Sequence, residues 1–287
     1  MLALRQLLRP MRIVLAAAAV CAAICAPAPA SAQGKLDAQY VVTLAGIPIG
    51  KGSWSIEVAD AHYSASATGA TTGLMRVLTE GEGSTTAQAT LGGGKVLSAT
   101  YVSTIKSRKQ KDEVHVTLEK GDVKDTRSDP PADHERERIP VTESDLHNVL
   151  DPMTASILTA PGTGNPVSAE VCERTMAVFD GRLRYDLKLA FKRMETVKAE
   201  KGYSGPAVVC AVYFTPISGY IPSRATIRYL AKQRDMEIWL APIEGTRMLA
   251  PFRAQGPTPI GEAVMTASQF LSVATPSHAS ANGHKGP

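Results

Sequence analysis

The sequence lacks the short motifs by which many enzymes and redox proteins are recognised. It has no Gly-x-Ser-x-Gly nucleophile motif and no Cys-x-x-Cys pair. Its glycine run at residues 92–94 is not followed by the Lys-Ser/Thr ending of a phosphate loop, so it is interpreted as a turn. No histidine stands at metal-ligand spacing from another histidine or a cysteine; the six are His62, His115, His134, His147, His278 and His284. We therefore predict no catalytic motif, no metal site and no cofactor.

A large net charge is also missing. The chain carries 31 basic and 27 acidic residues, and three of the arginines lie within residues 1–32, which contain no acidic residue. Without that segment the chain has 28 basic and 27 acidic residues. Such a balance gives no indication of a nucleic-acid partner.

The first 32 residues have the pattern of a secretory signal peptide. Arg5, Arg9 and Arg12 precede a short apolar run, and the small residues at 30–32 form an Ala-x-Ala cleavage site. We predict cleavage between Ala32 and Gln33; an uncleaved anchor is the alternative. No later stretch is apolar enough to cross a bilayer. The expected location is therefore the bacterial periplasm, as a soluble protein.

Cysteine is scarce, and export makes the scarcity informative. Two of the four cysteines, Cys21 and Cys25, lie within the predicted signal peptide, which leaves Cys172 and Cys210 in an oxidising compartment. Residues 183–191 alternate apolar and polar after an Asp-Gly turn at 180–181, which predicts a hairpin. We place both cysteines on strands and predict a disulfide between them; two buried free thiols are the alternative.

Short strands separated by turn residues fill most of the remaining chain. The fold class predicted is all-β: an antiparallel curled sheet forming an open or closed β-barrel or spiral with one or two short helices. Residues 33–275 are expected to form a single β-barrel-like domain, followed by a disordered tail at 276–287. Shorter elements are expected as well: a turn at 46–50, a helical turn at 73–78, an exposed loop at 125–140, and helices at 144–150, 152–158 and 223–233, with a strand as the alternative for the last of these. Asp151 is expected to cap the helix that begins at Pro152.

Several segments, taken in order, resemble a known family. They are Tyr-Val-Val-Thr-Leu-Ala-Gly-Ile-Pro-Ile-Gly at 40–50, Leu-Asp-Pro-Met-Thr-Ala at 150–155, the turn at 180–181 with Cys210, Glu-Ile-Trp-Leu-Ala-Pro-Ile at 237–243, and the stretch at 246–253. Together they resemble the exported bacterial proteins of the DUF3108 family. That family has no agreed activity, so the resemblance assigns no catalytic residue. In architecture alone the pattern is similar to periplasmic lipoprotein carriers and envelope-integrity proteins.

Two features could contact a lipid. A basic run at the end of an expected strand could touch anionic headgroups, or merely form an exposed hairpin end; it contains Lys106, Arg108, Lys109 and Lys111. Small residues recur on other strands and leave room either for an acyl chain or, as we favour, for close packing; they are Ala65, Ala67, Ala70, Ala87 and Ala89.

These observations predict a non-enzymatic periplasmic protein that supports cell-envelope integrity by binding a lipid, a lipoprotein or another envelope protein. The alternatives are an enzyme acting on envelope polymers with a site assembled from non-adjacent residues, and a purely structural scaffold. An apolar cavity would favour the binder, a polar cleft with converging histidines and carboxylates the enzyme, and a filled interior the scaffold.

Overall fold

The computed structural model describes residues 33–59, 62–72, 81–92, 95–108, 110–131 and 137–275. The signal peptide at 1–32, the helical turn at 73–78 and the tail at 276–287, all predicted from sequence, lie outside these ranges. Lys109 and most of the glycine run at 92–94 do so as well.

The first half of the described chain is an antiparallel meander. Seven strands follow one another, each paired with the next: β1 (Gly34–Leu44), β2 (Ile47–Ala59), β3 (His62–Thr71), β4 (Gly81–Gly92), β5 (Lys95–Ser107), β6 (Lys111–Glu119) and β7 (Asp122–Asp129). Their side chains alternate between the two faces. On β2, for example, Trp54, Ile56 and Val58 are buried while Glu57 is exposed. Alternation with period two is what a sheet with one covered face requires.

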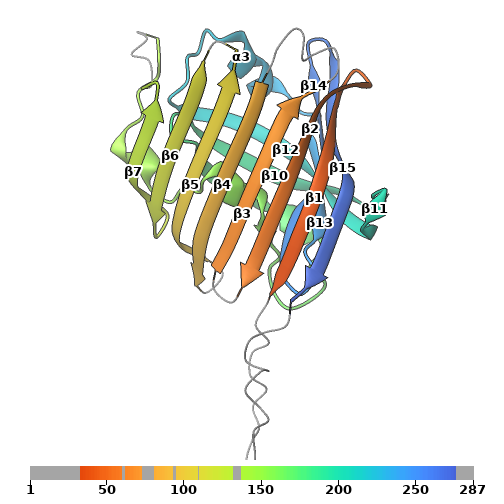
Figure 1. Ribbon diagram of the computed structural model, residues 1–287. Coiled ribbons are helices and arrows are strands. Elements are labelled where there is room, and N and C mark those ends of the chain that lie inside the picture. Colours follow the sequence, from red (N-terminus) through yellow and green to blue (C-terminus); the bar gives the residue numbers. More distant parts are fainter. Residues whose placement is uncertain are drawn as a thin grey trace, which may run out of the picture. The chain divides into compact units, whose positions relative to one another are not determined.

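The second half continues the same sheet beyond β1. Its strands are β8 (Leu158–Thr159), β9 (Arg174–Phe179), β10 (Arg184–Lys198), β11 (Lys201–Gly202), β12 (Ser204–Ser218), β13 (Glu237–Pro242), β14 (Met248–Thr258) and β15 (Gly261–Ala274). The order across the sheet is β7-β6-β5-β4-β3-β2-β1-β15-β14-β13-β12-β10-β9, with β11 beside β15 and β8 beside β14. Figure 1 shows the meander in front, with β10 and β12 crossing behind it. The predicted class, a mainly antiparallel curled sheet, is confirmed, and the sheet does not close.

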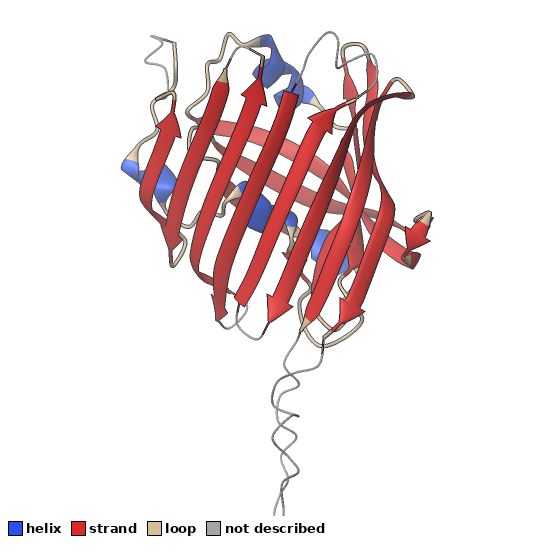
Figure 2. Cartoon of the chain, viewed as in Figure 1, coloured by secondary structure: helices blue, strands red, loops and turns tan. Residues whose placement is uncertain are grey.

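Short helices lie in the connections between strands from β7 onward (Figure 2). The single-turn helices are η1 (Glu143–Leu146) and η2 (Ala169–Cys172), and the α-helices are α2 (Pro152–Ser156) and α3 (Ala225–Lys232). The predicted helices at 144–150 and 152–158 are thus shorter than expected. The backbone N–H of Val149 donates to Gly121 at 2.8 Å, and Leu150 bridges to Val178 of β9. This segment therefore joins the β6–β7 turn to the other end of the sheet.

Two hydrophobic clusters hold the layers together. The larger lies inside the curl and includes Leu36, Ile56, Trp239 and Phe270. The smaller contains the residues packed around Cys172 and Cys210, including Val171, Val208 and Leu240. The sheet is therefore covered by packed residues on the inside of its curl, and its second half also carries the separate cluster around the two cysteines.

The predicted disulfide is present, with the Cα atoms of Cys172 and Cys210 5.4 Å apart. The expectation that Cys172 lies on a strand is wrong, because Cys172 ends the helical turn η2. Cys210 lies on β12, as expected. The bond therefore ties the segment before β9 to the middle of a central strand.

Two further expectations need correction. The turn predicted at 46–50 is confined to Ala45 and Gly46, because β2 already begins at Ile47 and pairs with Leu44. The loop predicted at 125–140 begins later, since residues as far as Asp129 pair with β6 as strand β7. Strand β7 is polar because it is an outer strand of the sheet, and polar composition alone resembles a loop.

Candidate functional site

A buried hydrogen-bond chain lies where α2 meets the inner face of the meander. Asp151 is 0% exposed and, as expected, caps α2 by accepting the backbone N–H of Thr154 at 2.9 Å. The hydroxyl of Thr154 also donates to Asp151, and Tyr63 of β3 shares a hydrogen bond with that same hydroxyl. The chain Tyr63–Thr154–Asp151 thus connects a helix to a strand 91 residues away in sequence.

Burial controls the ionisation of this chain. Desolvation raises the pKa of Asp151, although the hydrogen bonds from Thr154 act in the opposite direction. Desolvation, and then the nearby Asp151 carboxyl, also raise the pKa of Tyr63. A second carboxyl, Asp180, lies in the β9–β10 turn, and its pKa is raised by burial as well. The interior therefore favours neutral over charged forms of these groups.

One side of α2 borders a hollow of about 630 Å³. Tyr63 and Thr154 contribute hydroxyls to its lining, and Lys120 and Arg174 contribute positive charges. Most other walls are apolar; they include Leu91, Val149, Leu150, Ile157, Leu158, Met176 and Met248. We call this space the α2 hollow.

A second, smaller hollow of about 360 Å³ is lined by other residues of α2. Met153 and Pro152 lie against Tyr40, Trp54 and Tyr101 there, together with Met265. The indole N–H of Trp54 is buried and has no hydrogen-bond partner in the described structure. This second space thus combines aromatic rings and methionines with polar side chains such as Lys51, Thr68 and Thr85.

The small residues singled out in the sequence mostly serve packing, the alternative we favoured. Ala65, Ala87 and Ala89 are buried in the larger cluster, and Ala67 packs against it. Ala70 is exposed instead. Small side chains on β3 and β4 let α2 approach the sheet, and hollows remain beside the helix.

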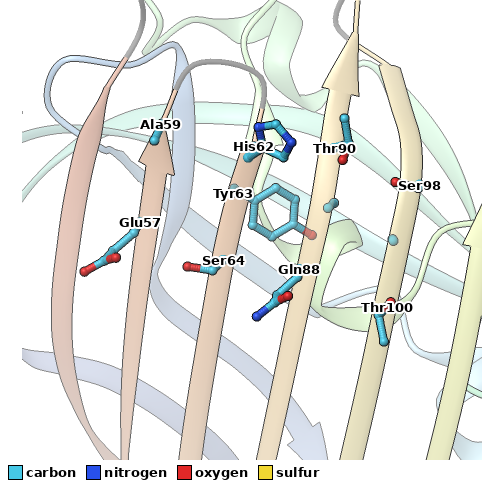
Figure 3. Close-up of a pocket in the computed structure, with 11 residues that line it drawn as sticks. Glu57, Ala59, His62, Tyr63, Ser64, Gln88, Thr90, Ser98 and Thr100 are labelled. Atoms are coloured by element: carbon cyan, nitrogen blue, oxygen red, sulfur yellow. The ribbon is translucent and has the colours of Figure 1, made fainter. Parts of the chain in front are cut away.

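A polar groove on the meander offers the best place for the enzyme alternative. Glu57, His62, Ser64 and Gln88 line it (Figure 3). In that view the Glu57 carboxylate points away from the His62 ring, and no hydrogen bond joins His62 to Ser64. Over the part of the chain that is described, no three His, Cys, Asp or Glu side chains are placed to hold a metal ion. The groove thus has polar groups without a nucleophile–base pair.

The basic run lies at the open end of the β5–β6 hairpin. Lys106 and Lys111 are paired across it, and each has a carboxylate partner: Glu82 at 3.5 Å and Glu113 at 2.7 Å. Arg108 follows β5, and Lys109 is outside the described residues. The contact of this basic run with anionic lipid stays a prediction. The charges of Lys106 and Lys111 are already paired with carboxylates.

Gln33, expected at the cleavage point, is buried at the start of the described chain and its carbonyl accepts from Thr275 at 3.1 Å. The cleavage itself stays a prediction. Sequence reasoning found the Asp151 cap from the Asp-Pro pair but missed its link to Tyr63. Nothing in the local sequence around residue 63 indicates a partner on α2.

Comparison with known proteins identifies the family. A family model, described as "Protein of unknown function (DUF3108)", matches residues 39–268. The chain belongs to the DUF3108 family. The match covers β1 to most of β15, so the predicted resemblance is confirmed, and α2 with its hollow lies inside the DUF3108 region. No curated protein and no solved structure matches this DUF3108 chain.

Proposed function

We propose that the protein is an exported, non-enzymatic envelope protein that binds an amphiphilic lipid in the α2 hollow. The observation that carries the proposal is the hollow itself, about 630 Å³ with mostly apolar walls and a few convergent polar groups. Ligand sites in proteins typically have about 300–1,000 Å³ and this kind of lining. An interior filled throughout would have favoured a scaffold.

The lining supports a lipid with an anionic headgroup. Lys120 is exposed and has no ion pair in the described structure, and Arg174 donates only to the carbonyl of Thr159, at 3.0 Å. Either cation is available to an anionic group, while each methylene placed against the apolar walls contributes about 0.8 kcal/mol. The hydroxyls of Tyr63 and Thr154 also line the hollow, and because their protons are used within the Tyr63–Thr154–Asp151 chain, the Tyr63 oxygen is left to accept a hydrogen bond from a headgroup.

Two observations support export. The predicted signal peptide and the Cys172–Cys210 bond both fit an oxidising compartment. Among the residues described, no helix has the length and apolarity needed to span a bilayer. The polar groove of Figure 3 would be the site to examine if an activity were found.

Native mass spectrometry of the protein purified from the periplasm, before and after mild organic extraction, tests the proposal. We expect a lipid mass that extraction removes. The variant Ile157→Trp, which fills the hollow, should lose that mass, because Ile157 lines it. The control Ile260→Trp, at a side chain 73% exposed, should keep it. Wild-type protein without a bound lipid would contradict the proposal and favour a purely structural role.

A further inference from the structure

The long strand β10 has an edge that is only partly covered. Strand β12 pairs with β10 along its whole length, on one side. On the other side β9 pairs with Arg184 to Leu189 and then ends, with Arg174 opposite Leu189. No described segment forms backbone hydrogen bonds with residues 190–198 on that side. We call residues 190–198 the open edge of β10.

The position of a proline shows which backbone groups face this edge. Pro206 of β12 lies opposite Thr196 and has no N–H, and its carbonyl accepts the Tyr203 hydroxyl at 2.7 Å. In an antiparallel pair, opposite residues either exchange both hydrogen bonds or direct both groups outward. Thr196 therefore directs its N–H and C=O to the open edge, and so does Met194 two residues before it.

The open edge lacks the protection that sheet edges commonly have. Strand β7, at the far end of the sheet, carries charges at Lys124, Asp125, Arg127 and Asp129, which discourage pairing. On β10 the cations Lys192 and Arg193 both bind Glu237, and Arg193 also binds Glu195 at 3.0 Å, so these charges are already balanced within one copy. The side chains of Phe191 and Met194 are 41% and 45% exposed.

The sequence of the open edge is complementary to itself. When Met194 is placed opposite the Met194 of a second, antiparallel strand, Arg193 lies opposite Glu195 on both sides of the two-fold axis. Opposite charges facing each other across antiparallel strands favour pairing, and the outward backbone groups of the two Met194 residues become each other's partners.

We propose that two copies of this chain associate through the open edge of β10, as antiparallel strands related by a two-fold axis at Met194. The contact is isologous and closes after two copies, so it gives a dimer and not a fibre. It also covers the exposed Phe191 and Met194 side chains. This inference is independent of what binds in the α2 hollow.

Sedimentation equilibrium of the purified protein over about a hundredfold concentration range tests the dimer, because its population must follow mass action. The variant Met194→Pro removes a donor that faces the edge and leaves the β12 side intact, so we expect dimerisation at least about tenfold weaker. A protein that stays monomeric throughout would overturn the proposal, as would a dimer that Met194→Pro does not weaken.

Two substitutions at one exposed position give the matched control. Met194 is 45% exposed and would lie opposite the Met194 of the second copy. Met194→Lys would place two like charges opposite each other across the axis and should weaken the dimer severalfold, less at high salt, whereas Met194→Leu should leave it unchanged. Equal affinities would contradict the pairing. Hydrogen exchange adds a readout in the wild type: the N–H group of Met194 should become protected as concentration rises.

Discussion

At the scale of single residues, Asp151 is the buried group that caps the start of helix α2. It is fully buried and accepts the backbone N–H and the hydroxyl of Thr154. Asp151→Ala removes a helix cap, which costs about 0.5–2 kcal/mol, and leaves buried donors unpaired, which costs about 1–3 more. We expect a total loss of about 2–4 kcal/mol in the free energy of unfolding, measured by urea denaturation.

Asp145 provides the control for that substitution. It belongs to the capping box of η1, where it accepts the N–H of Thr142 at 2.8 Å in a solvent-exposed hydrogen bond, although the residue itself is half-buried. Because water can replace a surface acceptor, Asp145→Ala should cost less than about 1 kcal/mol. Equal losses at Asp151 and Asp145 would show that burying the cap does not increase its contribution to the free energy of unfolding.

The same residue makes stability depend on pH. Burial raises the pKa of the Asp151 carboxyl above its value in the unfolded chain. A raised folded-state pKa means that the contribution of Asp151 is fully present below the unfolded value of about 4 and is lost as the pH rises through the folded value. The variant Asp151→Asn cannot titrate, so the stability of the wild type relative to this variant should fall from pH 4 upward. A difference that increases with pH in urea denaturation would contradict this assignment.

At the scale of elements, the β9–β10 turn shows how the curled sheet is fixed. Gly181 has φ +95°, and a Cβ placed there would lie 2.2 Å from Cγ1 of Val114 on β6. The turn thus packs directly on the inner face of the meander. Gly181→Ala combines a strained backbone, about 1–3 kcal/mol, with a steric clash of similar size.

Gly162 separates these two causes. Its φ is +62°, yet a Cβ there would meet nothing within 4 Å. Thermal unfolding of Gly162→Ala should therefore show only the backbone cost, about 1 kcal/mol. If both variants lost the same stability, the contact between the turn and β6 would not matter.

The elements that sequence predicted well are those with local signals. The alternation on β2 and the Asp-Gly turn at 180–181 specify strands and a hairpin within a few residues. The Asp-Pro pair likewise fixes the start of α2. The sequence of strand β7 resembles a loop because the strand lies at an edge of the sheet, where polar residues are common. Its place there depends on pairing with β6, which the local sequence does not indicate. Phe191, the last apolar position of the alternation at 183–191, is exposed, and β9 ends before reaching it.

At the scale of the whole molecule, the site could not be predicted because it is made by long-range contacts. The α2 hollow combines Tyr63 of β3, Thr154 of α2, Arg174 of β9 and Met248 of β14. No spacing in the sequence relates these positions. The sequence predicted an interior in which small residues would either pack or leave room, and the structure does both, at adjacent places along α2.

The disulfide determines how much of this arrangement survives in a reducing environment. It closes a loop with a sequence separation of 38 residues, for which the chain-entropy model gives about 4 kcal/mol. Typical domains have a net stability of about 5–15 kcal/mol, so the bond is a large share of the total.

The double variant Cys172→Ala/Cys210→Ala should unfold at a clearly lower urea concentration than the oxidised wild type, and wild type kept reduced should behave like the variant. Cys172 and Cys210 are both 0% exposed, so replacing them by alanine removes no side chain that contacts solvent. If reduction left the urea midpoint unchanged, the packing around Val171, Val208 and Leu240 would be sufficient to hold the segment before β9 on the sheet, and the bond would have no bearing on where the protein can fold.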